Sequence, residues 1–223
     1  MAKLEQENNI KLEVLTNIFI VEKGTLKILL ERKKEEPYKG YWMLPGEILK
    51  NTETIENTLE KVLQETIGTT EVYKEQNYTF SEINRNQNTR LLATSYITLI
   101  DIKTKELKTS NKEDKEIQWF TINQLPKLAF DHKQIIEKAQ ELLKTILSNS
   151  TVLKKLFPSD FTLPELQNIY ESIMNIRLDR RNFRKKFINL GLIEDTGYKS
   201  EGRSGRPAKL YRFKENIKEK NLF

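Results

Sequence analysis

The sequence predicts an α+β chain with two domains. The part up to residue 147 combines β-rich runs with two amphipathic helical patterns, whereas residues 160–213 read as two helices followed by a hairpin. A length of 223 residues is sufficient for two domains that each bury a core. Residues 151–223 carry 16 Lys and Arg against 9 Asp and Glu, while residues 1–150 carry 22 against 23. A net charge of +7 on the last third against −1 on the rest predicts a polyanionic partner, most often nucleic acid, for that third.

Residues 1–147 are expected to form the first domain. Its strands are predicted at the β-rich runs 12–21, 25–33, 71–80, 91–101 and 117–120. Apolar residues recur on one helical face at 53–67 and again at 130–147, which predicts two amphipathic helices. Asp131 and Gln134 are placed as a capping pair for the second helix.

A linker is expected at 148–159, and residues 160–223 are expected to form the second domain. Its elements are, in order, a helix that begins at the capping box Thr162–Glu165, a helix at 178–191 capped by Asp179 and ended by Gly191, and a hairpin of 192–195 with 208–213. The loop of this hairpin is rich in glycine and arginine.

The composition excludes several classes of protein. The chain has no cysteine, which rules out disulfides, thiol nucleophiles and cysteine metal sites. Its single histidine, His132, argues against Ser-His chemistry and a multi-histidine zinc site, and a structural role beside the helix cap is expected for it. No apolar run approaches the roughly 20 residues that a membrane span needs, and the polar start of the chain is not a signal peptide. A cytoplasmic protein without a membrane partner is therefore expected.

The run from Gly46 to Thr69 resembles the Nudix box, whose pattern is G-x5-E-x7-R-E-U-x-E-E-x-G-U, where U is apolar. With Gly68 as the anchor, Glu53 falls on the early glutamate and Glu65 on one of the two late glutamates. The other key positions carry different residue types, with Glu47 for the first glycine, Lys61 for the arginine, Val62 for the glutamate after it, and Thr66 for the remaining late glutamate. The resemblance implies a Nudix-like α/β/α sandwich with a mixed sheet for the first domain.

Hydrolytic Nudix proteins hold Mg²⁺ with carboxylates at positions i, i+3 and i+4 of this helix, which share one face. Here these positions are Val62, Glu65 and Thr66. Glu56 and Glu60 lie about 120–160° around the helix from Val62, so they cannot converge on the same ion. No catalytic residue, metal ligand or cofactor is therefore expected. Glu65 is either an ordinary solvated residue of an amphipathic helix or a residue that contacts a ligand or orders a loop.

Three further segments resemble one branch of the Nudix family, the NrtR-like transcriptional regulators. These segments are 35–46, 78–96 and 119–136. Members of this branch keep the Nudix fold, usually lose hydrolysis, and sense a small metabolite. The resemblance implies an effector that is ADP-ribose or a related nucleotide, or a sugar such as arabinose.

The resemblance also implies an effector site. The family's R-D-P-R motif corresponds to residues 85–88, where only the first arginine is kept. Arginine is the natural bidentate partner of a phosphate or carboxylate, and an aromatic ring can stack on a ligand. The candidate effector-binding residues are Arg32, Lys39, Trp42, Glu65, Arg85 and Arg90. The alternative is that Arg32 and Lys39 are ordinary surface charges and that Trp42 packs within a strand.

Residues 160–213 resemble the winged helix-turn-helix domain of the same regulators. In the helix at 178–190, Phe183, Phe187 and Leu190 share an apolar face that must be buried, so basic and amide side chains occupy the opposite face. Arginine can read guanine and asparagine can read adenine in the major groove, and a glycine-rich wing lets arginines reach phosphates or a narrow minor groove. The predicted DNA-binding residues are Arg180, Arg181, Asn182, Arg184, Lys185, Lys186, Arg203, Arg206 and Lys209.

These features predict a ligand-responsive DNA-binding transcriptional regulator, expected to be a repressor, whose degenerate Nudix domain senses a small metabolite. One recognition helix reads only a few base pairs, so a homodimer on a pseudo-palindromic double-stranded DNA operator is expected. The alternative from another class is a Nudix hydrolase of ADP-ribose or a sugar nucleotide with an accessory basic domain. An RNA-binding module has little support, because the basic segment lacks the interleaved exposed aromatics that single-strand binders use.

Overall fold

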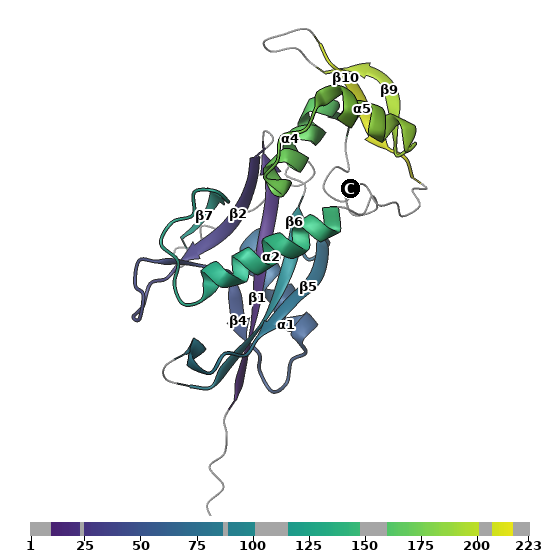
Figure 1. Cartoon of the computed structure of the whole chain (residues 1–223). Coiled ribbons are helices and arrows are strands. Elements are labelled where there is room, and N and C mark those ends of the chain that lie inside the picture. The colour runs from purple at the N-terminus through teal and green to yellow at the C-terminus, as the bar shows by residue number, and fades with distance from the viewer. Residues whose placement is uncertain are drawn as a thin grey trace, which may run out of the picture.

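The computed structural model describes residues 10–22, 25–86, 89–100, 116–147, 160–200 and 207–215. Two domains follow one another along the chain (Figure 1). The first has a seven-stranded mixed sheet with one α-helix packed on each face. The second is smaller, and its described part consists of two helices and a three-stranded sheet. The predicted α+β class is therefore confirmed.

The sheet of the first domain is built around β1 (Lys11–Glu22), which pairs in parallel with β6 (Leu91–Ile100) and antiparallel with β2 (Thr25–Arg32). The strand order is β3-β2-β1-β6-β5, and β4 and β7 pair with β1 and β2. The remaining strands are β3 (Trp42–Met43), β4 (Gly46–Ile48), β5 (Tyr73–Phe80) and β7 (Ile117–Thr121). Because β4 pairs with the first residues of β1, the loop that follows β4 lies beside the start of β1.

The two faces of the sheet carry separate cores. Successive side chains of a strand point to opposite faces, so Val14 packs beneath α1 (Ile55–Ile67) while Leu15 packs beneath α2 (His132–Leu147). Both helices lie where the apolar periodicity predicts them, within two residues at each end.

Local signals fix the limits of α1. The Thr54 hydroxyl accepts a hydrogen bond of 3.2 Å from the Asn57 amide, which satisfies one of the free N–H groups of the first turn. Gly68 ends the helix in the left-handed conformation, with a φ of 74°. The box sequence thus forms the loop and helix that its pattern predicts.

The second domain has the elements of a winged helix. They are β8 (Phe161–Thr162), α4 (Leu163–Met174), α5 (Arg180–Asn189), β9 (Ile193–Lys199) and β10 (Lys209–Phe213). Thr162 and Glu165 form the predicted capping box, and Gly191 follows α5 with a φ of 66°. The hairpin of β9 and β10 is confirmed, but β9 runs four residues further than the sequence predicts, and β8 was not predicted.

The two domains share a core on the α2 side of the sheet, which continues from the first domain into α4 and α5. The Tyr170 hydroxyl in α4 donates a hydrogen bond of 3.1 Å to the Leu147 carbonyl at the end of α2. At the edge of the same junction, the Leu26 amide donates to the Ser172 hydroxyl over 3.4 Å. The winged helix domain is therefore packed against α2 and the start of β2. Of the described helices, none has the length and apolar character needed to cross a membrane.

Candidate effector pocket and DNA interface

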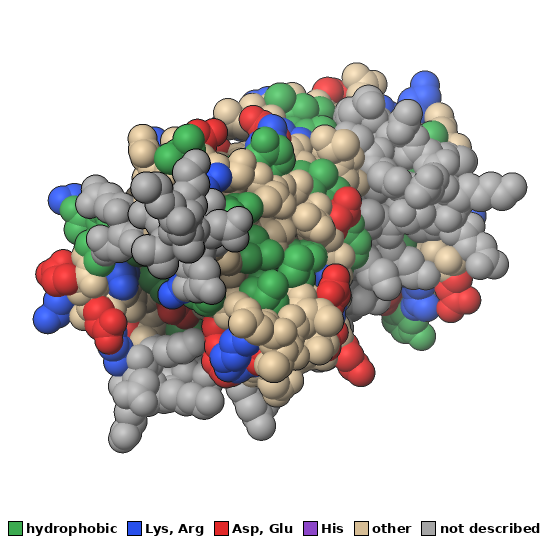
Figure 2. All heavy atoms as spheres, turned by 90° about the horizontal axis from the view of Figure 1, so that it is seen from below, with side chains coloured by type: hydrophobic (Ala, Val, Ile, Leu, Met, Phe, Trp, Pro, Cys, Tyr) green, Lys and Arg blue, Asp and Glu red, His purple; other side chains and the backbone are tan. Residues whose placement is uncertain are grey.

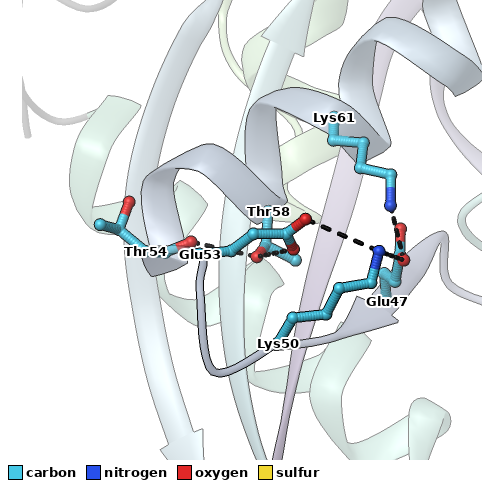
Figure 3. Close-up of polar contacts among 6 residues, drawn as sticks. All are labelled: Glu47, Lys50, Glu53, Thr54, Thr58 and Lys61. Carbon is cyan, nitrogen blue, oxygen red and sulfur yellow. Dashed lines mark hydrogen bonds and ion pairs between the residues drawn. The ribbon is translucent and has the colours of Figure 1, made fainter.

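The loop between β4 and α1 brings together charged side chains of the Nudix-like box (Figure 3). Lys61 Nζ lies 2.7 Å from Glu47 Oε1. Lys50 Nζ lies 3.8 Å from the same oxygen and 3.7 Å from Glu53 Oε1. The Thr58 hydroxyl donates to Glu53 Oε2 over 3.3 Å. Hydrogen bonding to Glu47 is the main reason that the pKa of Lys61 is raised. Two ammonium and two carboxylate groups, from β4, the loop and α1, therefore alternate in space in the order Lys61, Glu47, Lys50 and Glu53.

Of the three helix positions that hold a metal in Nudix hydrolases, only one carries a carboxylate here, Glu65. Val62 is 5% exposed and Thr66 is 1% exposed, so both uncharged side chains are buried, and Glu65 is half-buried. Among the described residues, no group of three or more His, Cys, Asp or Glu side chains is arranged to bind a metal ion. Magnesium is held by oxygen ligands in near-octahedral geometry, and Val62 and Thr66 supply no carboxylate oxygen to such a site.

A pocket of about 560 Å³ opens beside this charged loop, between the start of β1 and the loop after β4. The start of β1 lies at the end of the first domain that faces away from the winged helix domain (Figure 1). Seen from below, hydrophobic side chains gather in the middle of this end of the molecule (Figure 2). The pocket is lined by Ile10, Lys11, Leu12, Ile48, Leu49, Lys50, Asn51 and Glu53. Its volume lies within the usual range for small-molecule sites. Four apolar side chains, two lysines and the carboxylate of Glu53 line it, so it can contact both apolar and charged parts of a ligand.

The wall of the pocket continues into the loop after β5. The Lys11 amide donates a hydrogen bond of 2.9 Å to the Arg90 carbonyl. The Arg90 guanidinium donates in turn to the carbonyls of Ser81 and Glu82, at 2.8 and 3.0 Å. Arg90 therefore connects the loop that contains the 3-10 helix η1 (Ile83–Arg85) to the start of β1.

Arg85 lies in a buried ionic cluster. Its Nη2 is 3.1 Å from Glu13 Oε2, its Nε is 2.8 Å from Asp131 Oδ2, and only 2% of its side chain is exposed. Burial raises the pKa of Glu13, although the charge of Arg85 opposes this shift. The prediction that Asp131 caps α2 with Gln134 is wrong. The Gln134 amide bonds instead to the main-chain carbonyl of Asp131, because the Asp131 carboxylate faces Arg85.

His132, the first residue of α2, is a buried and neutral side chain. The Leu44 amide donates a hydrogen bond of 2.9 Å to His132 Nδ1, which must therefore be unprotonated. Burial and, second, the positive charge of Arg85 lower the pKa of His132 to about 3. This hydrogen bond fixes the chain before β4 against α2, which agrees with the structural role predicted for His132.

The six predicted effector residues fall into three groups, and none of them lines the 560 Å³ pocket. The groups are Arg32, Lys39 and Trp42 around the connection from β2 to β3, Arg85 and Arg90 at η1, and Glu65 on α1. The Arg32 guanidinium lies 6.0 Å from the centre of the Trp42 ring and 3.1 Å from Glu116. Sequence reasoning missed the pocket lysines Lys11 and Lys50, because no local signal predicts that β4 pairs with the start of β1.

In the second domain, α5 presents the predicted basic face to solvent. The Asp179 carboxylate caps this helix by accepting a 2.9 Å hydrogen bond from the Asn182 amide. The opposite face is buried against Tyr170, whose ring centre lies 5.6 Å from that of Phe183 and 5.5 Å from that of Phe187. The exposed side chains of α5 include Arg180, Arg181, Asn182, Arg184 and Lys185, and Lys186 is half-buried. This arrangement can place cations and amides in a DNA groove.

The wing contributes a further cation. Lys209 in β10 is exposed and lies 2.6 Å from Asp195 in β9, and hydrogen bonding to Lys209 is the main cause that lowers the pKa of Asp195. The two other residues predicted in the wing, Arg203 and Arg206, lie outside the described residues.

Glu171 holds the turn between α4 and α5, and sequence analysis did not single it out. Its carboxylate accepts hydrogen bonds of 2.8 Å from the Leu178 amide and from Gln167 Nε2. Asn175 ends α4 in the left-handed conformation, with a φ of 53°. These contacts set the orientation of α5 relative to α4.

Two family models match the chain in the order of its domains. The NUDIX domain model matches residues 13–139, and the NrtR DNA-binding winged helix domain model matches residues 154–213. The second match begins within the segment expected as a linker, and that segment lies outside the described residues.

Two relatives of known function are similar to the chain. The ADPR responsive transcriptional repressor NtrR of Acinetobacter baylyi is 34% identical over 200 residues, which cover 88% of this chain and 79% of the relative. The ADP-ribose pyrophosphatase of Methanocaldococcus jannaschii is 35% identical over 118 residues, which cover 53% of this chain and 68% of the relative. The first similarity spans both domains, whereas the second spans about half of the chain.

Solved structures agree with this division. Shewanella oneidensis NrtR complexed with a 27mer DNA matches with a TM-score of 0.76 and 32% identity, over 91% of this chain and 93% of that one. The NUDIX domain of the same NrtR, complexed with ADP ribose, matches with a TM-score of 0.53 and 27% identity, over 64% of this chain and 94% of that one. The chain therefore belongs to the NrtR family of ligand-responsive transcriptional regulators, in which a Nudix domain is joined to a DNA-binding winged helix domain.

Proposed function

We propose that this regulator is a repressor that responds to ADP-ribose and binds it in the 560 Å³ pocket of the Nudix domain. The observation that supports this assignment is that Lys11 and Lys50 line one pocket together with four apolar side chains, and that their two positive charges exceed the single negative charge of Glu53. ADP-ribose carries a charged pyrophosphate between an adenosine and a ribose, so it can use both kinds of contact. A pentose such as arabinose has no charge for the lysines to neutralise. The Acinetobacter relative responds to ADPR, which favours the same effector class here.

The test is fluorescence anisotropy of labelled DNA from upstream of the protein's own gene and its neighbours, at near-physiological salt with nonspecific competitor. ADP-ribose is expected to lower the affinity for one of these fragments, whereas arabinose and other pentoses leave it unchanged. A shift caused by a pentose and not by ADP-ribose would reject the effector assigned here. Lys11→Gln is expected to weaken the response and keep the DNA affinity. Lys133→Gln, an exposed lysine of α2, is the matched control.

The six effector residues predicted from the sequence remain candidates, and their positions suggest different roles. Arg90 is directly connected to the pocket, because its main-chain carbonyl accepts a hydrogen bond from the amide of the pocket residue Lys11. Arg85 would act through Glu13, which holds its guanidinium. Arg32, Lys39 and Trp42 would form a separate cationic and aromatic surface, which Arg32→Ala tests in the same anisotropy assay.

We further propose that the Nudix domain does not hydrolyse ADP-ribose. Val62 and Thr66 are buried and uncharged where the box pattern carries glutamates, so a magnesium site has no ligands there. Incubation with Mg²⁺ and ADP-ribose is therefore expected to give no AMP or ribose 5-phosphate above the level without protein.

The second candidate function is ADP-ribose hydrolysis, which the similarity to the Methanocaldococcus pyrophosphatase favours. Steady turnover that stops with EDTA would establish it and would refute the interpretation of Val62 and Thr66.

On DNA, we propose that Arg181 and Arg184 contact bases or phosphates and that Lys185 and Lys186 contact phosphates. Arg180, Asn182, Arg203, Arg206 and Lys209 are the remaining candidates. The exposure of the basic face of α5, opposite Phe183 and Phe187, supports this assignment. A homodimer would place two such helices on the half-sites of a palindromic operator. Analytical ultracentrifugation with and without operator DNA tests this stoichiometry.

We propose the domain division 1–147, 148–159 and 160–223, in which the middle segment is the linker. Limited proteolysis followed by mass spectrometry would locate the boundary. The cytoplasmic location stays a prediction from the sequence.

A further inference from the structure

The row of charges on the Nudix-like box has an arrangement that a metal site does not have. Each carboxylate lies beside at least one ammonium group, with Glu47 between Lys61 and Lys50, and Glu53 next to Lys50 (Figure 3). The four groups therefore neutralise one another without any added ion. Because Glu47 stands where the box has glycine and Lys61 where it has arginine, their pairing joins the start of the motif to its helix across 14 residues.

A divalent cation would bind weakly to this row of charges. Glu47 Oε1 already accepts a hydrogen bond from Lys61 and lies near Lys50, so a metal would have to displace both lysines or bind beside two positive charges. The family pattern would supply further carboxylates at positions 62 and 66, and here both side chains are uncharged and buried. Two features therefore disfavour metal binding. Positions 62 and 66 lack carboxylate ligands, and the ammonium groups of Lys50 and Lys61 repel a divalent cation.

We propose that Lys50 and Lys61 neutralise the carboxylates of Glu47 and Glu53, so that this Nudix domain binds the anionic part of its effector without a divalent cation. The two lysines have different roles. Lys61 pairs with Glu47 and neutralises it, whereas Lys50 lines the 560 Å³ pocket and can turn its ammonium group to a phosphate. The effector part of this proposal rests on the proposed function, but the neutralisation of the two carboxylates by lysines does not.

The first experiment measures Mn²⁺ binding to the full-length protein, by isothermal titration calorimetry and by the EPR signal of free Mn²⁺. The wild type is expected to show no specific site. The double variant Lys50→Gln/Lys61→Gln leaves Glu47 and Glu53 without their cations and is expected to bind Mn²⁺ at least about tenfold more tightly, since about 1.4 kcal/mol corresponds to a factor of ten. The matched control is Lys74→Gln, which removes the ion pair of 2.8 Å between Lys74 and Glu60 outside the row. This control is expected to behave like the wild type.

A specific Mn²⁺ site in the wild type would overturn the proposal, and so would a double variant that binds Mn²⁺ no more tightly than the wild type. Lys50 and Lys61 are 55% and 35% exposed in their side chains, so neither substitution disturbs the core. The single variant Lys61→Gln gives an independent measurement, with a smaller gain expected because Lys50 still lies near Glu47.

The second experiment measures the affinity for ADP-ribose in EDTA and in Mg²⁺. The wild type is expected to bind equally well in both. The double variant is expected to lose at least about tenfold in EDTA and to recover part of this loss with Mn²⁺. A wild type that needs Mg²⁺ would overturn the proposal. Absence of ADP-ribose binding under every condition would reject the proposed effector, and the Mn²⁺ measurements would still decide whether the lysines neutralise the two carboxylates.

Discussion

The neutral, buried His132 makes the stability of the protein depend on pH in a predictable direction. Its pKa is about 3 in the folded protein and 6.5 in the unfolded chain, so the unfolded chain binds the extra proton first. The stability that the neutral ring contributes is complete above pH 6.5 and is lost as the pH falls towards 3. From these two values, the free energy of unfolding decreases by about 2 kcal/mol between pH 7 and pH 5. For a chain of this size, that corresponds to about 4–8 °C in Tm.

The comparison with His132→Asn isolates this effect. The Asn side chain does not titrate, and its carbonyl oxygen can still accept from the Leu44 amide. The variant is expected to be less stable than the wild type at pH 7, because it fills less of the site, but to lose much less between pH 7 and pH 5. Thermal unfolding followed by circular dichroism at both pH values measures this difference. Burial raises the pKa of Glu13, so this residue acts in the opposite direction, but it is common to both proteins. Parallel losses in the two proteins would refute the assignment of the effect to His132.

Three further predictions concern other parts of the molecule. Arg85→Met leaves Glu13 and Asp131 without their shared cation and is expected to cost about 3 kcal/mol in urea unfolding at pH 7; a loss below about 1 kcal/mol would contradict the buried cluster. Tyr170→Phe removes the hydrogen bond between the domains and is expected to cost about 1–2 kcal/mol in the same assay, whereas unchanged stability would mean that water replaces the hydroxyl. Arg181→Ala is expected to cost about 1–3 kcal/mol of operator binding by anisotropy, while binding equal to that of the wild type would exclude a base contact.

Local signals in the sequence were sufficient to predict most elements of the fold. The apolar spacing of α1 and the caps Thr162 and Asp179 each depend on residues within one or two helical turns. For this reason the helices of both domains were predicted within two residues at the ends with a cap. The strands of only two or three residues, β3, β4 and β8, were not predicted. Phe161–Thr162 becomes β8 only because β10, some 50 residues later, pairs with it.

The candidate pocket could not be predicted for a related reason. It forms where the start of β1 meets the loop after β4, and the pairing of Leu15 with Gly46 depends on the whole sheet. The same limit applies to Arg85. As an isolated arginine in a polar loop it is an effector candidate, whereas in the fold it lies between Glu13 and Asp131, which are 72 and 46 positions away and are joined to it only by the tertiary structure.

Helix α2 connects the Arg85 cluster to the winged helix domain, so a movement of α2 must also move the DNA-binding domain. Its first turn lies beside the Arg85 cluster, and its last residue, Leu147, receives the hydrogen bond of Tyr170. A straight helix of 16 residues is about 24 Å long, so a tilt of about 5° at one end carries the other end by about 2 Å. Because the core around Leu147 continues into α4 and is close-packed, the winged helix must follow such a displacement and cannot slip past it. A ligand that shifts the first turn of α2 can therefore change the position of the winged helix without contacting the DNA.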